Sequence, residues 1–270
     1  MLQLPDQPTI LDKITDQTRE DLIRRKKKHS MADFRSFPLY GAERKDFRRA
    51  IIPERGVSVI AEVKKASPSK GIIRKNFNPL KTAEWYAEAG ASGISVLTDE
   101  PFFKGSLNYL QDIRKASELP LLRKDFIVDF YQIEEARAYG ADAVLLIATI
   151  TSGSQLSELH HAATEAGLQC LVECYDEKDF DQVDYKYIDI LGVNNRNLKT
   201  FEVDLHRGIK LLQSAPDHVI KVSESGLSKT EDLKLLADEG IHSALIGESL
   251  MREKHPGDAL KKLLEPFRED

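Results

Sequence analysis

Cysteine and long apolar runs are scarce in this 270-residue chain, and each scarcity excludes a class of protein. Only two cysteines are present, which is too few for a disulfide framework and favours a reducing compartment. No apolar run approaches the roughly 18 residues that a membrane-spanning helix needs. The first residues also lack the basic and apolar regions of a signal peptide. We therefore expect a cytoplasmic protein with no membrane partner.

An excess of positive charge is also missing. The chain has 39 Lys and Arg against 44 Asp and Glu, a formal net charge of -5, so the whole molecule does not attract nucleic acid. An anionic substrate must then be drawn by local positive charge. The basic run at 24–28 is interpreted as the solvated end of a helix, whose dipole favours cations there. A nucleic-acid patch is the alternative for this run, but we expect no nucleic-acid partner.

The first 50 or so residues differ in pattern from the rest. Here apolar residues recur near helical spacing in a charged background, namely Ile10, Leu11, Ile14, Leu22 and Ile23. The length allows two small domains or one large one, and barrels of this length form a single domain. We predict one domain over 1–270, in which about 1–50 is an N-terminal helical extension.

From residue 58 onward, short β-rich segments alternate with helical ones. Strands are predicted at 58–64, 93–98, 120–124, 142–148, 168–173, 188–194, 219–224 and 244–247. Helices are predicted at 79–89, 106–117, 131–139, 154–166, 205–213 and 230–238, the last with capping-box spacing at Ser228 and Glu231. Alternation implies a parallel sheet, and eight units predict a (β/α)8 TIM barrel. An open, doubly wound sheet is the main structural alternative.

Polar residues gather where the predicted strands end, which is the functional face of such a barrel. Residues two apart on a strand share a face, so Glu62 and Lys64 share one with Ile60. By the same rule Lys124, Glu173, Asn194 and Glu224 face the barrel axis. Several charges then converge at one mouth. A structural ion-pair network among Glu62, Lys64, Lys124 and Glu173 is the alternative to a catalytic group, and the two readings are compatible.

The ends of the last two strands favour phosphate binding. Ser225 and Gly226 follow the seventh predicted strand, and Gly247, Glu248 and Ser249 follow the eighth. Glycine lets backbone N–H groups approach an anion, and the N-terminus of a following helix is positive. These two loops form the recurrent phosphate site of the fold.

At these residues the sequence resembles the indole-3-glycerol phosphate synthase family. The segment 61–71, AEVKKASPSKG, resembles the signature of that family. Further segments agree in order: ILDKI at 10–14, ISVLTD at 94–99, FKGS at 103–106, LRKDFI at 122–127, LVE at 171–173, GVNNRNL at 192–198, VSESGL at 222–227 and LIGESLMR at 245–252. The resemblance covers nearly the whole chain.

The resemblance implies ring closure, decarboxylation and dehydration of 1-(2-carboxyphenylamino)-1-deoxyribulose 5-phosphate, without cofactor or metal. It implies that the N-terminal extension covers the barrel mouth. By matching position it makes Lys124 the general acid and Glu173 the general base, with Glu62, Lys64 and Asn194 in the same catalytic group. The substrate-binding residues that it implies are Arg196, near an anionic part of the substrate, Ser67, Phe103, Phe126, Glu224, Ser225, Gly226, Gly247 and Glu248.

The chemistry of ring closure requires that the carbonyl oxygen be protonated while the aromatic carbon attacks. A lysine ammonium can do this, especially if neighbouring cations and partial burial lower its pKa. How Lys64 and Lys124 divide the acid roles stays open at the level of sequence.

Two rival functions use the same fold. One is a sugar-phosphate isomerase or epimerase, which the charge set at Glu62, Lys64, Lys124 and Glu173 disfavours. The other is a non-catalytic sensor of phosphorylated ligands, which would not need those charges.

Cys170 and Cys174 are expected on the helix-facing side of their strand as buried small residues, with a metal pair as the alternative. The expected partner is a phosphorylated small molecule, and the expected assembly is a monomer or a weak dimer.

Overall fold

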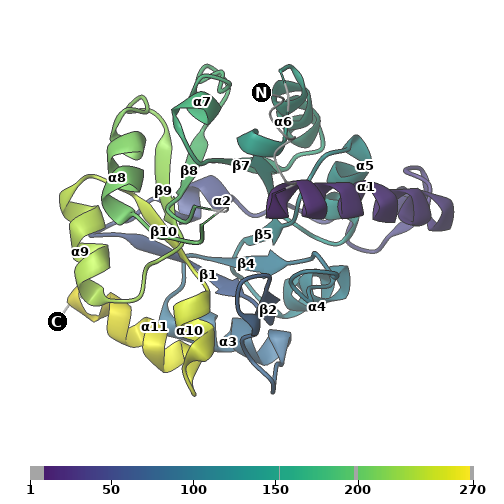
Figure 1. Ribbon diagram of the computed structural model, residues 1–270. Helices are drawn as coiled ribbons and strands as arrows, with labels where there is room; N and C mark the ends of the chain where they lie inside the picture. Colours follow the sequence, from purple (N-terminus) through teal and green to yellow (C-terminus); the bar gives the residue numbers. More distant parts are fainter. Residues whose placement is uncertain (1–8, 152, 198–199, 268–270) are drawn as a thin grey trace, which may run out of the picture.

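The computed structural model describes residues 9–151, 153–197 and 200–267, and its centre is a closed parallel barrel ringed by helices (Figure 1). Neighbouring strands follow the order β1-β10-β9-β8-β7-β6-β5-β4 around the barrel. Their bounds are β1 Ser58–Val63, β4 Gly93–Leu97, β5 Leu121–Lys124, β6 Ala143–Ile147, β7 Gln169–Cys174, β8 Ile190–Asn194, β9 Ile220–Glu224 and β10 Ser243–Ile246. The barrel prediction is confirmed, and the open sheet is excluded.

Alternation along the strands divides the core in two. Inward side chains such as Ile60, Leu122, Leu171 and Val222 form one buried cluster inside the barrel. Outward side chains such as Val59 join the larger cluster between the strands and the helices. Both faces of each strand are therefore buried, as expected for a parallel sheet covered by helices.

Six of the outer helices coincide with predicted segments to within one residue, and three were not predicted. Their bounds are α3 Pro79–Ala89, α4 Leu107–Ala116, α5 Phe130–Ala138, α6 Gln155–Glu165, α7 Glu177–Phe180, α8 Leu205–Gln213, α9 Thr230–Asp238, α10 Glu248–Arg252 and α11 Pro256–Leu264. The predicted capping box of α9 is wrong by one position. Asp232, not Glu231, accepts the backbone N–H groups of Ser228 and Lys229, at 2.8 and 2.9 Å.

Two short elements lie outside the alternating pattern. The strands β2 (Ala66–Ser67) and β3 (Gly71–Ile72) pair as a small hairpin in the loop that follows β1. Helix α2 (Phe47–Ala50) lies at the N-terminal ends of the strands, where Phe47 and Ile51 join the interior cluster of the barrel. Ser58 at the start of β1 donates its hydroxyl hydrogen to the Ile51 carbonyl at 2.7 Å. The bottom of the barrel is thus closed by the N-terminal extension.

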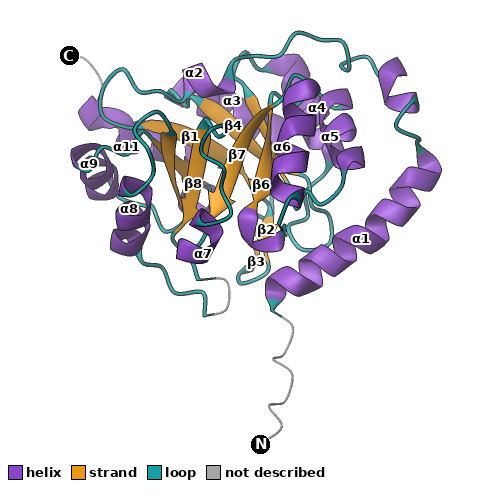
Figure 2. Ribbon diagram, turned by 90° about the horizontal axis from the view of Figure 1, so that it is seen from above, coloured by secondary structure: helices purple, strands orange, loops and turns teal. Residues whose placement is uncertain are grey.

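Helix α1 (Ile10–Lys28) is a single long helix that lies beside α5 and across one side of the barrel (Figures 1 and 2). Thr9 caps it, and Asp12 completes a capping box. The basic run occupies its last turn, as predicted. Across the part of the chain that the structure describes, no helix has both the length and the apolar character needed to cross a membrane.

Candidate active site

A cavity of about 380 Å³ opens where the carboxyl ends of the strands meet. It brings together every residue proposed above for catalysis or binding, from seven strand ends and the loops that follow them. They are Glu62, Lys64, Ser67, Phe103, Lys124, Phe126, Glu173, Asn194, Arg196, Glu224, Ser225, Gly226, Gly247 and Glu248. The positional argument from strand ends therefore predicted residues that line one cavity.

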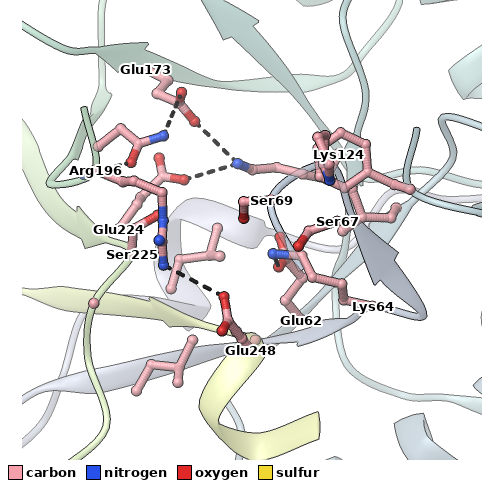
Figure 3. A pocket seen from close by; sticks show the side chains of 18 of the residues that line it. Glu62, Lys64, Ser67, Ser69, Lys124, Glu173, Arg196, Glu224, Ser225 and Glu248 are labelled. Atoms are coloured by element: carbon pink, nitrogen blue, oxygen red, sulfur yellow. Dashed lines mark hydrogen bonds and ion pairs between the residues drawn. The ribbon is translucent and has the colours of Figure 1, made fainter. Parts of the chain in front are cut away.

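Lys124, the last residue of β5, extends its ammonium between two carboxylates (Figure 3). Its Nζ lies 3.1 Å from Glu173 Oε2 and 3.0 Å from Glu224 Oε2. Asn194 Nδ2 donates to the other oxygen of Glu173 at 3.2 Å. Each side chain comes from a different strand, so the barrel itself fixes their mutual geometry.

These surroundings raise the pKa of Lys124. Burial alone would lower the pKa of its ammonium, but the carboxylates of Glu173, Glu224 and Glu62 outweigh burial and raise that pKa. Neighbouring cations, which would lower this pKa, are not what surrounds Lys124, because the charges nearest to its Nζ are negative. Lys124 is fully protonated at neutral pH and is held in place by its partners.

The two carboxyl groups beside Lys124 differ in acidity. Burial would raise the pKa of Glu173, yet Lys124 and the hydrogen bond from Asn194 lower it overall. Burial and the nearby Glu173 charge instead raise the pKa of Glu224 to about 8. Glu173 is therefore the more acidic of the two carboxyl groups. Such a split between neighbouring carboxyl groups is typical of acid–base sites.

A second ion pair joins Glu62 and Lys64 on the adjacent side of the pocket. Both residues project inward from the end of β1, as alternation predicted. Gly247 makes room for this pair, because a Cβ there would lie 2.4 Å from Glu62 Oε2. The four residues of the ion-pair network considered from sequence thus form two separate pairs, Glu62 with Lys64 and Glu173 with Lys124, and both pairs line the pocket.

One end of the pocket is apolar and aromatic. The rings of Phe103 and Phe126 are 5.9 Å apart at 35°. Asp99 fixes the loop that carries Phe103, since its Oδ1 accepts the N–H groups of Phe102 and Phe103 at 2.9 and 3.0 Å. Three residues of α1 complete this apolar end and were not predicted as part of the site, namely Ile10, Leu11 and Ile14. Their apolar spacing, combined with the expected cover of the mouth, was the available signal.

The opposite end of the pocket carries the glycine- and serine-rich loops. Ser225 and Gly226 have φ values of 71° and 80°, so the chain turns sharply after β9. Before α9, the Asp232 carboxylate accepts the N–H groups of Ser228 and Lys229, so a negative charge already lies at the N-terminus of this helix. Helix α10 follows Gly247 directly, with no side chain capping it.

Charged side chains border this second end. Arg196 Nη2 lies 3.5 Å from Glu248 Oε2 (Figure 3). On its other side, Glu248 Oε1 lies 2.9 Å from Arg252 Nη2. Arg252 also lines the pocket and was not predicted. The Glu248 carboxylate is thus held between two guanidinium groups, so it does not face the cavity as an unbalanced negative charge.

Ser67 shows an unused hydrogen-bonding group. Its Oγ is buried beside the pocket and finds no partner among residues 9–151, 153–197 and 200–267. Buried hydroxyl groups are nearly always hydrogen-bonded, so this one is available to a bound molecule.

Away from the site, Cys170 and Cys174 are buried against the helices, as predicted. No cluster of three metal-binding side chains occurs in the described part of the chain.

Comparisons with known proteins agree with this geometry. The family model described as indole-3-glycerol phosphate synthase matches residues 11–263. The enzyme of that name from Salinibacter ruber is 51% identical over 94% of this chain and 95% of its own length. The one from Campylobacter jejuni (strain RM1221) is 48% identical over 94% of this chain and its full length.

Solved structures with low sequence identity support the fold alone. A thiamine phosphate pyrophosphorylase from Pyrococcus furiosus has a TM-score of 0.60 at 14% identity, covering 82% of this chain and 96% of its own. A chain of the tryptophan synthase complex from the same organism has a TM-score of 0.56 at 15% identity, covering 79% and 98%. With the family model and close relatives spanning almost its whole length, this chain belongs to the indole-3-glycerol phosphate synthase family, the carboxy-lyases of tryptophan biosynthesis.

Proposed function

We propose that the pocket closes the pyrrole ring of 1-(2-carboxyphenylamino)-1-deoxyribulose 5-phosphate, with Lys124 as general acid and Glu173 as general base. The observation that carries this assignment is the Lys124 ammonium, held 3.1 and 3.0 Å from two carboxyl groups inside one cavity. The apolar end and the glycine-rich end of that cavity match the two ends of the substrate.

The substrate would lie along the long direction of the pocket. Its carboxyphenyl ring packs against Phe103 and Phe126, and its phosphate lies at Ser225, Gly226 and Gly247. Arg196 borders the phosphate end, and Glu248 contributes through its backbone, since a carboxylate would repel a phosphate. Ser67 offers its free hydroxyl from the loop after β1. Fixing both ends folds the flexible sugar chain back onto the ring, which lowers the entropic barrier to closure.

Ring closure joins the ring carbon that bears the carboxylate to the carbonyl carbon of the sugar. Lys124 donates its proton to the carbonyl oxygen as the new bond forms. The cationic ring then loses carbon dioxide, and its electrons restore the aromatic system. In the dehydration step the hydroxyl group leaves as water after protonation, while Glu173 removes the C–H proton. Asn194 orients Glu173, and Glu62 holds Lys64 ready for the second acid role.

The raised pKa of Lys124 has two consequences for this chemistry. It keeps the proton available at neutral pH, and it makes Lys124 a weaker acid than free lysine. A weak acid suffices, because the alkoxide that develops during attack is more basic than a lysine amine. The ordered ion pairs also mean that little reorganisation is needed at the moment of proton transfer.

Replacement of Lys124 by alanine tests this proposal. We expect Lys124→Ala to lose nearly all turnover, measured by the ultraviolet absorbance of the indole product and by carbon dioxide release. Binding of inorganic phosphate, measured by calorimetry, should persist because that end of the pocket is untouched. Lys65→Ala, which removes a neighbouring charge outside the pocket, is the control. Near wild-type turnover in Lys124→Ala would remove this residue from the mechanism, and turnover without carbon dioxide release would favour an isomerase.

The wider setting of the enzyme is proposed on the same basis. We infer that 1–270 acts as one catalytic domain, with the N-terminal extension as part of the pocket wall. We also infer a monomer, or a weak dimer, in the cytoplasm. A biosynthetic role and two free, buried cysteines support the location.

A further inference from the structure

Arg25, in the second half of α1, makes a contact between this helix and α5. Its Nε donates to Glu135 Oε1 at 2.9 Å, and the two side chains also form an ion pair. The Glu135 side chain is 4% exposed and that of Arg25 is 27% exposed, so the pair is largely shielded from water. Close by, Tyr131 Oη donates to the Arg25 carbonyl at 3.0 Å. The second half of α1 is therefore fixed to α5.

The first half of the same helix forms part of the pocket. Ile10, Leu11 and Ile14 line the cavity at its aromatic end, and Ile14 packs in the cluster that contains Phe126. At a rise of about 1.5 Å per residue, Ile10 lies roughly 22 Å along the helix from Arg25. A tilt of about 5° at the Arg25 end would move Ile10 by about 2 Å. Small changes at the anchor are thus amplified at the substrate.

Glu135 has a second partner that remains when Arg25 is removed. Arg123, which is fully buried on β5 next to Lys124, donates from Nη2 to Glu135 Oε2 at 2.9 Å. Arg123 also pairs with Asp125 at 2.7 Å. Loss of Arg25 therefore leaves no buried carboxylate uncompensated, so its effect on the barrel core should be small.

We propose that Arg25 is a positioning residue, which clamps α1 to Glu135 and so holds the apolar wall of Ile10, Leu11 and Ile14 over the substrate. Arg25 does not touch the cavity and acts only through the helix. The inference rests on the proposed function, because it requires that the aromatic ring of the substrate lie against this wall. A loosened wall weakens ground-state and transition-state binding alike, and it therefore raises KM with little change in kcat.

The experiment compares Arg25→Gln with Arg24→Gln. Arg24 is the adjacent residue, carries the same charge and pairs with Asp21 inside α1. We expect Arg25→Gln to raise KM about tenfold, because one partly exposed, charge-assisted hydrogen bond is lost. The kcat of this variant should stay within about twofold of the wild-type value. Arg24→Gln should change neither value. Competitive inhibition by inorganic phosphate should be the same in all three proteins, because the phosphate end is remote from α1.

The outcomes separate the clamp from a general structural role. Equal KM values in the two variants, or a lower Tm in Arg25→Gln with an unchanged KM, would overturn the proposal. If Arg25→Gln does not fold, the same measurements are made on Arg25→Lys. An Arg25→Lys variant with the KM of the wild type but a lower Tm would overturn the proposal. A wild-type protein that forms no indole product would instead refute the proposed function, so the two failures are distinguishable.

Discussion

Gly192 on β8 leaves the space that the Glu224 carboxyl group occupies, and Gly192→Ala would fill it. A Cβ at this position would lie 2.3 Å from Glu224 Oε1 and 3.2 Å from Leu171 Cδ1. Ordinary contacts between carbon and oxygen begin near 3.3 Å, so the carboxyl group must retreat by about 1 Å. The φ of Gly192 is not positive, and the backbone therefore accepts alanine without strain.

The size of the effect follows from what that carboxyl group holds. Glu224 Oε2 lies 3.0 Å from Lys124 Nζ, and a retreat of about 1 Å weakens this contact and lets the ammonium turn toward Glu173. A misplacement of about 1 Å in a catalytic group can reduce the rate by up to about 100-fold. We expect kcat to fall between about 10-fold and 100-fold. Stability should change by less than about 2 kcal/mol, since only the end of a flexible side chain moves.

Initial rates at saturating substrate, followed by indole absorbance, measure kcat, and thermal unfolding gives Tm. Gly41→Ala is the matched control, because a Cβ there meets no atom within 4 Å. The reasoning is refuted if Gly192→Ala keeps kcat within twofold of the wild type. It is also refuted if the loss of activity merely follows a large loss of Tm.

Two further predictions concern protonation. Burial raises the pKa of both the Cys170 and the Cys174 thiol, so the native protein should resist labelling by iodoacetamide at pH 8. The denatured chain should be labelled at both positions. Rapid labelling of the native protein would contradict this prediction. Burial raises the pKa of Glu224 from 4.5 to about 8, so between these values the folded chain keeps a proton that the unfolded chain releases, and stability falls as pH rises. The Glu224→Gln variant lacks this contribution. Plots of Tm against pH for the wild type and for this variant should therefore diverge between pH 5 and pH 8, and parallel plots would contradict the prediction.

The layout of the site was predictable because it depends on two short-range rules. Alternation along a strand places Lys124 and Glu173 inward, and strand polarity places both at the same mouth. These rules use only residue spacing, so they required no knowledge of packing. The same rules gave Glu62 and Lys64, and the predicted strand bounds differ from the observed ones by at most two residues.

Other features depend on contacts between distant segments, and the sequence pattern does not contain them. The direction of the pKa shift at Lys124 could not be predicted, because residue spacing does not reveal that Glu224 meets it from across the barrel. The Arg25–Glu135–Arg123 chain joins three elements through side chains that look like ordinary surface charges in the sequence. The α9 cap moved from Glu231 to Asp232 because two residues of similar chemistry competed for one role.

The charges of this site also explain how a barrel can keep ammonium groups at the top of its core. A lone ammonium there would lose its proton or destabilise the fold, so each lysine needs a carboxylate partner. The partners that keep Lys124 charged also raise its pKa, so the resting enzyme holds a protonated acid at neutral pH, although that acid is weaker than free lysine. This balance suits a reaction whose developing oxyanion is strongly basic.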